Sequence, residues 1–167
     1  MTIPFDYLVR EAESINVKLE MIAGVPVWEA SPVFRHQQAS QRIATSLKPL
    51  PDSSCACIQT QDTYFKFPDG SQKRPDIAVL CQEPPLEAQD APLEMIPVAV
   101  VEIISKNYEY KDLVLAPPFY LEVGVLDILI FNPADNSVLH YRRDFEQPKQ
   151  YISPITLQLE CGCEITV

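Results

Sequence analysis

The chain has 167 residues, of which 47% are hydrophobic and 22% charged, proportions typical of a globular protein and not of a disordered or fibrous one. Thirteen Lys and Arg against 23 Asp and Glu give a net charge of −10, which disfavours a protein that coats nucleic acid or anionic membrane through bulk charge. The longest apolar run, residues 96–101, is far shorter than the roughly 20 residues that cross a bilayer, so we expect no membrane association.

Charged residues also occupy the start of the chain, where a signal peptide needs an apolar stretch: Asp6, Arg10, Glu11 and Glu13. We therefore expect a cytoplasmic protein. The length and the absence of a composition break or internal repeat predict a single domain over residues 1–167.

The first fifty residues predict two helices around a β-hairpin. A helix begins at Pro4, with Thr2 as a candidate N-cap, and places one apolar face inward: Phe5, Leu8 and Val9. Residues 17–21 and 25–29 flank Ala23-Gly24 and predict the hairpin. A second helix opens at Ser31-Pro32 and stops at residues 49–51, and its expected core residues are Phe34, Ile43 and Leu47.

Strands separated by turns are predicted for the centre of the chain. Residues 55–67 and 76–80 have strand character on either side of the turn 68–71. In this turn the proline fixes its own φ angle, and the glycine can adopt the positive φ that a turn often requires. A proline-rich acidic connection, 82–97, leads to a strand over 98–104 that is apolar on both faces apart from Glu102.

The last third of the chain predicts one interrupted helix and several strands. Residues 108–123 have helical content, interrupted at Pro117-Pro118, where we expect the helix to start again. A strand over 126–131, apolar on both faces, turns into 138–142, and 155–167 adds one or two more. Strands apolar on both faces must be covered on both sides, so the fold class is mixed α/β, with helices flanking a mixed central β-sheet.

Charge is unevenly distributed along this layout. From residue 75 to 105 there are six acids and no Lys or Arg. The segments before it carry several cations: Arg35, Arg42, Lys48, Lys66, Lys73 and Arg74. The net charge is therefore compatible with one basic face and one acidic loop.

Five cysteines are present: Cys55, Cys57, Cys81, Cys161 and Cys163. An odd number in a chain without an export signal argues against a disulfide framework. The two Cys-x-Cys pairs could form a four-thiolate zinc site, but on a strand this spacing only places both thiols on one face. Buried, apolar-like thiols are the favoured interpretation, with zinc as the weaker alternative.

Two acids stand out because of the apolar strands that contain them. Asp76 opens the strand 76–80, and Glu102 lies inside 98–104. A carboxylate inside a sheet is costly unless it is paired, protonated or metal-bound, and two close carboxylates suit Mg²⁺ or Mn²⁺. The alternative is that each acid lies at a strand end and meets solvent or an arginine.

An ordered set of motifs resembles a known family over nearly the whole chain. Residues 74–79, Arg-Pro-Asp-Ile-Ala-Val, and residues 100–105, Val-Val-Glu-Ile-Ile-Ser, resemble the Pro-Asp…Glu core of restriction-endonuclease-like nucleases. Within these the chain is more closely similar to the Uma family of endonucleases, through further motifs: Leu-Glu-Met-Ile-Ala-Gly at 19–24, Ser31-Pro32 with His36, Tyr120, Gly124-Val125 and Phe131-Asn132-Pro133.

The resemblance implies a restriction-endonuclease-like fold and metal-dependent hydrolysis of DNA phosphodiester bonds. In that scheme Asp76 and Glu102 hold Mg²⁺ (or Mn²⁺), the carbonyl of Ile103 completes the coordination, and Glu20 is a candidate third acid. Glu20 could equally be an exposed hairpin residue. Family habit also implies a homodimer.

The lysine of the family pattern is displaced. The core motif places it at residue 104, which is Ile104, and the Uma pattern places it at Ala116. Lys106 and Lys111 are the nearby substitutes. Because a missing lysine removes a stabilising charge, the alternative function is an inactive nuclease fold kept as a binding or regulatory module. His36 is interpreted as a capping or packing residue rather than a general base.

Overall fold

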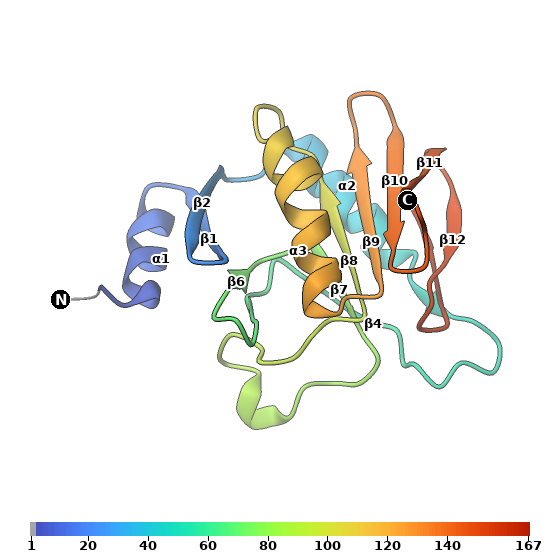
Figure 1. Ribbon diagram of the computed structural model, residues 1–167, viewed down its shortest axis with the longest axis horizontal. Helices are drawn as coiled ribbons and strands as arrows, with labels where there is room; N and C mark the ends of the chain where they lie inside the picture. The colour runs from blue at the N-terminus through green and yellow to red at the C-terminus, as the bar shows by residue number, and fades with distance from the viewer. Residues whose placement is uncertain (1–2) are drawn as a thin grey trace.

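A six-stranded mixed sheet forms the centre of the computed structural model, which describes residues 3–167 (Figure 1). The strand order is β11-β10-β9-β8-β7-β4, and the pair β8–β9 is parallel while all other neighbours are antiparallel. The bounds are β4 (Ile58–Gln61), β7 (Ile77–Leu80), β8 (Ala99–Ile103), β9 (Asp127–Asn132), β10 (Ser137–Arg142) and β11 (Lys149–Ile152).

Helices cover both faces of this sheet. Alternate residues of β7 point to opposite sides, so Ile77 and Val79 pack with Ile43 of α2 (Phe34–Thr45). Residues 78 and 80 pack on the other side with Phe119 of α3 (Ala116–Val123), the helix that crosses the near face of the sheet in Figure 1. The predicted mixed α/β class, with helices flanking a mixed central sheet, is confirmed.

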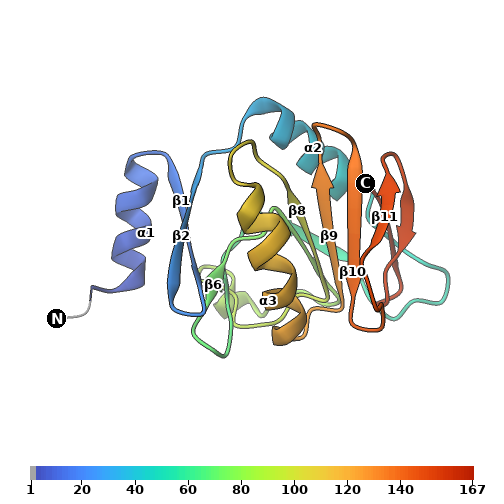
Figure 2. The ribbon, with the colours of Figure 1, turned by 45° about the horizontal axis from the view of Figure 1, so that its top comes forward.

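A second sheet, of order β2-β1-β6-β5, lies beside the first and carries α1 on its outer side (Figure 2). Its elements are α1 (Phe5–Ser14), β1 (Val17–Ile22), β2 (Val25–Ala30), β5 (Phe65–Lys66) and β6 (Gln72–Lys73). The predicted hairpin is therefore present, with Leu19 opposite Trp28. Pro4 is the N-cap of α1, and the predicted cap Thr2 lies outside the described residues.

A third, small sheet has the order β12-β13-β3: β12 (Thr156–Gln158), β13 (Cys163–Thr166) and β3 (Lys48–Pro49). The prolines at 49–51 do not end α2 as predicted, because the helix already ends at Thr45 with Ser46 as its C-cap; Pro49 instead pairs with β13. Phe34, expected in the core, is 79% exposed because it lies on the opposite side of α2 from the buried face, which includes His36 and Ile43. The strand character predicted for 55–67 is limited to β4 and β5.

The helical run after β8 is continuous where an interruption was predicted. A π-helical turn, η2 (Lys111–Leu115), leads directly into α3, and the two prolines lie at its start. Proline lacks the N–H that an α-helix needs at this place, and the wider π turn removes the conflict. Gly124 ends α3 with φ of +102°, a conformation that favours glycine.

The cysteines contradict the prediction of a reduced, apolar-like set. Cys55 is bonded to Cys81 and Cys57 to Cys163, whereas Cys161 is free. An odd count therefore did not exclude disulfides, because tertiary packing brings together thiols that are 26 and 106 residues apart in the chain.

Candidate active site

Asp76 and Glu102 meet at the end of the β7–β8 ladder. Ile77 pairs with Val101, so residue 76 comes next to residue 102 in the same antiparallel register. Asp76 Oδ2 accepts a hydrogen bond from the backbone N–H of Ile103 at 2.7 Å, and the backbone N–H of Asp76 donates to Glu102 Oε2 at 3.2 Å. Each carboxylate thus binds backbone of the opposite strand, and both are buried, with 8% and 0% of their surface exposed.

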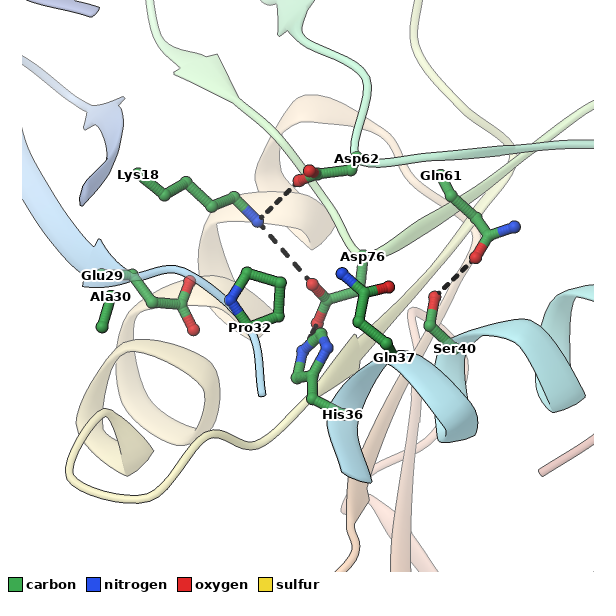
Figure 3. A pocket seen from close by; sticks show the side chains of 10 residues that line it. All are labelled: Lys18, Glu29, Ala30, Pro32, His36, Gln37, Ser40, Gln61, Asp62 and Asp76. Atoms are coloured by element: carbon green, nitrogen blue, oxygen red, sulfur yellow. Dashed lines mark hydrogen bonds and ion pairs between the residues drawn. The ribbon is translucent and has the colours of Figure 1, made fainter. Parts of the chain in front are cut away.

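Asp76 lies between a histidine and a lysine (Figure 3). His36 Nε2 of α2 lies 3.0 Å from Asp76 Oδ2, and Lys18 Nζ of β1 lies 3.7 Å from Oδ1. Burial alone would raise the pKa of Asp76, but Lys18 and His36 outweigh it and hold the pKa well below its usual range. A small pocket leads to this carboxylate, and its wall includes Glu29 and Gln37. His36, interpreted from the sequence as a capping or packing residue, is part of the site.

Glu102 has a different environment. Its Oε1 accepts a hydrogen bond from the hydroxyl of Tyr120 on α3 at 2.7 Å, and Lys73 Nζ lies 3.6 Å away. Burial raises the pKa of Glu102 despite Lys73 and Lys111. The pKa values of the two central acids are therefore shifted in opposite directions. Asp76 is kept ionised, whereas Glu102 is more readily protonated.

Glu20, the candidate third acid, forms ion pairs with two lysines. Its Oε2 accepts a hydrogen bond from Lys73 Nζ at 2.9 Å and lies 3.7 Å from Lys111 Nζ, while Oε1 accepts the backbone N–H of Arg74 at 2.7 Å. Burial would raise the pKa of Glu20, but Lys73 and Lys111 outweigh it and lower the pKa well below its usual range. It is therefore a buried residue of the site and not an exposed hairpin glutamate.

Lys111 lies in η2, and its side chain reaches Glu20 and Glu29 of the site. Its Nζ lies 2.6 Å from Glu29 Oε2 and 3.2 Å from Asp112 Oδ1, with 4% of the residue exposed. Neither carboxylate oxygen of Asp112 has a hydrogen-bond partner in the described chain, and burial raises the pKa of Asp112 to about 8. Lys106, the other candidate lysine, is exposed and lines a surface pocket that also contains His36 and Ile104.

Several residues of this cluster were not proposed as site residues from the sequence: Lys18, Glu29, Lys73, Asp112 and Tyr120. A signal existed in β1, where Lys18 and Glu20 share one face of a strand and Lys18 pairs with Glu29 of β2. Lys73 was assigned to a basic face, but it is fully buried. The residues paired with it are far away in sequence, so no local pattern identified it.

The donor atoms of this cluster fit a hard divalent cation. Five carboxylates face three lysines: Glu20, Glu29, Asp76, Glu102 and Asp112 against Lys18, Lys73 and Lys111. Magnesium prefers oxygen ligands, keeps several waters and is commonly held by one or two carboxylates, which Asp76 and Glu102 supply. Within residues 3–167 no three acid or imidazole ligand atoms of this cluster all lie within 4.8 Å of one another. Asp76 and Glu102 are therefore the two carboxylates that would hold such an ion, and the backbone carbonyl of Ile103 follows Glu102 in the chain.

Comparison with known proteins identifies the family. Residues 6–162 match the Uma2 family, which is described as "Putative restriction endonuclease". The chain belongs to this family. A solved structure of "a putative nuclease belonging to DUF820" from Anabaena variabilis shares 17% identity, covers 96% of this chain and 92% of its own, and superposes with a TM-score of 0.70. The Uma2 chain therefore has the fold of that nuclease.

A comparison with curated proteins finds no match. Among residues 3–167, no helix combines the length and the apolar character needed to cross a membrane.

Proposed function

We propose that this Uma2 protein is a metal-dependent endonuclease that hydrolyses phosphodiester bonds of DNA. The observation that supports it most directly is the crossed pair of hydrogen bonds that places the buried carboxylates of Asp76 and Glu102 at the same end of the β7–β8 ladder. Membership of a family described as "Putative restriction endonuclease" supports this reaction class.

Asp76 and Glu102 hold Mg²⁺ or Mn²⁺ in this proposal, with the Ile103 carbonyl as a further ligand. The bound ion supplies an activated water and neutralises charge on the scissile phosphate. Asp76 is suited to this role because its carboxylate is kept ionised by Lys18 and His36.

Lys111 takes the place of the displaced motif lysine. Its ammonium is buried beside Glu20, Glu29 and Asp112 and stays protonated, because Glu20 and Asp112 outweigh burial and raise its pKa. A fixed positive charge of this kind stabilises the negative charge that develops on phosphate in the transition state. Glu20 positions Lys111 and Lys73, and Lys106 at the surface pocket is a secondary candidate for contact with phosphate.

Nicking of supercoiled plasmid in Mg²⁺ or Mn²⁺ tests the proposal. We expect Asp76→Asn and Glu102→Gln each to lower the nicking rate at least ~100-fold, and Lys111→Met by ~10²–10³-fold. Glu94→Gln is the matched control, because its carboxylate forms a surface pair with Lys66, and it should leave the rate unchanged. Nicking that is absent from the wild type, or equal in all variants, would contradict enzymatic activity.

A specific observation supports the second function, an inactive nuclease fold that binds or regulates. The cations expected on one basic face are largely paired with acids: Lys48 with Glu164, Lys66 with Glu94, and Arg74 with Glu13 and Asp62. Calorimetric titration with Mn²⁺ separates the two functions. An active site binds Mn²⁺ in a manner that Asp76→Asn abolishes, whereas an inactive fold gives no binding heat that depends on Asp76.

Two further expectations belong to this proposal. A homodimer is expected from family habit and is measured by light scattering at several protein concentrations. A cytoplasmic location is also part of the proposal and is measured by fractionation of cells that produce the protein.

A further inference from the structure

All five cysteines converge at the end of β7 opposite to the candidate active site. Asp76 directly precedes β7 and Cys81 directly follows it, so the two clusters are separated by the length of this strand. The sulfur atoms of Cys55, Cys161 and Cys163 lie within 4.8 Å of one another. Cys57 is bonded to Cys163, and Cys81 to Cys55.

The position of Cys161 is not explained by the disulfides. Its thiol is free, yet it lies within 4.8 Å of two sulfur atoms that belong to different disulfides. The sulfur atoms of Cys55 and Cys163, also from different disulfides, are 3.5 Å apart. Four sulfur atoms at ~2.3 Å from a tetrahedral zinc ion stand ~3.8 Å from each other, which is the spacing scale of this cluster.

The backbone removes the objection to short Cys-x-Cys spacing. Neither pair lies along a strand: residues 55–57 form an irregular segment and 160–162 form a turn that ends at β13. Cys57, in the first pair, has φ of +52°, and Gly162, between the two cysteines of the second pair, has φ of +88°, so the chain bends within each Cys-x-Cys segment. These bends give the curvature that an extended strand lacks.

Backbone contacts hold the three cysteine segments together independently of the sulfur atoms. Ala56 N–H donates to the carbonyl of Cys81 at 3.0 Å, and Leu50 N–H donates to the carbonyl of Gly162 at 2.9 Å. A Cβ at Gly162 would lie 2.6 Å from the hydroxyl oxygen of Ser53, so this turn is pressed against the segment before Cys55. The thiols therefore stay close when the disulfides are reduced.

We propose that the reduced cluster is a thiolate site for a soft divalent cation, zinc above all. Cys55, Cys161 and Cys163 are three ligands, and either Cys57 or Cys81 is the fourth. A dithiol reductant passes two electrons and two protons to each disulfide and is itself oxidised to a disulfide. Each ligating thiol then releases one proton as the metal binds. The metal replaces the disulfides as the link between the segment 55–57 and the small third sheet, which contains Cys163.

The test uses the full chain, reduced with a phosphine under nitrogen and titrated with Co²⁺ alone. We expect one equivalent to bind with the visible absorption of tetrahedral Co²⁺–thiolate, and Zn²⁺ to displace it. Cys161→Ser should lose this spectrum, although it leaves both disulfides of the oxidised chain intact. The double variant Cys57→Ser/Cys81→Ser should lose it too, whichever thiol is the fourth ligand.

Two controls make the result decisive. Asp76→Asn should keep the full Co²⁺–thiolate spectrum, which assigns the ion to the cysteines and not to the acids. Zn²⁺ should raise the Tm of the reduced wild type but not that of reduced Cys161→Ser. The proposal is overturned if the reduced wild type gives no tetrahedral thiolate spectrum, or if Cys161→Ser gives the same spectrum as the wild type.

Discussion

Lys73 offers the sharpest stability test because its ammonium is fully buried between two carboxylates. Its Nζ lies 2.9 Å from Glu20 and 3.6 Å from Glu102. Lys73→Met keeps the volume of the side chain but leaves both acids without this charge. Removing one partner of a buried ion pair costs ~3–5 kcal/mol. Lys111, 3.7 Å from Glu20, still compensates part of the negative charge of Glu20. We therefore expect the free energy of unfolding to fall by ~3 kcal/mol and the Tm by ~10 °C.

Urea and thermal unfolding of the oxidised chain measure this loss, and a double-mutant cycle with Glu20→Gln isolates the pair. The double variant should be more stable than the sum of the single effects by ~2 kcal/mol, because it leaves no unpaired charge at that contact. Lys66→Met, which removes a surface ion pair with Glu94, is the control and should cost less than ~1 kcal/mol. The reasoning fails if Lys73→Met costs no more than Lys66→Met, or if the cycle is additive within ~0.5 kcal/mol.

Two further substitutions test single contacts by thermal unfolding. Tyr120→Phe removes the 2.7 Å hydrogen bond to buried Glu102 and should cost ~1–3 kcal/mol, whereas Tyr110→Phe on the exposed surface should leave Tm unchanged. Equal Tm values for the two variants would contradict a role for this hydrogen bond. Gly162→Ala should cost ~3 kcal/mol, since it combines a left-handed backbone with a close contact to the neighbouring serine hydroxyl. Gly70→Ala has a similar φ but open space and should cost only ~1 kcal/mol, so equal losses would remove the steric argument.

The sequence predicted the architecture well where a pattern was local. The hairpin β1–β2, the strands on both sides of Glu102 and the cover on both faces of the sheet follow from alternation and from apolar runs. Short strands such as β3 and β6 were missed because two residues carry no periodic signal. Their pairing is decided by tertiary contacts alone.

At the candidate site, the sequence identified the acids better than the cations. Asp76 and Glu102 were found because a carboxylate inside an apolar strand is costly in any fold. Lys73 could not be found in this way, because its partners Glu20 and Glu102 lie on other elements. The same limit applies to the cysteines, whose grouping depends on how the third sheet docks on the end of β7.

The parallel pairing of β8 with β9 explains why the lysine of the site need not follow Glu102 at a set distance. Because β8 and β9 are parallel, the chain must return from the end of β8 to the side of the sheet where β8 began before it can enter β9. This crossover connection starts at the end of β8. Lys111 lies on the first turns of this path, nine residues after Glu102. The crossover between β8 and β9, and not a fixed interval after Glu102, therefore brings the Lys111 ammonium to Glu20, Glu29 and Asp112.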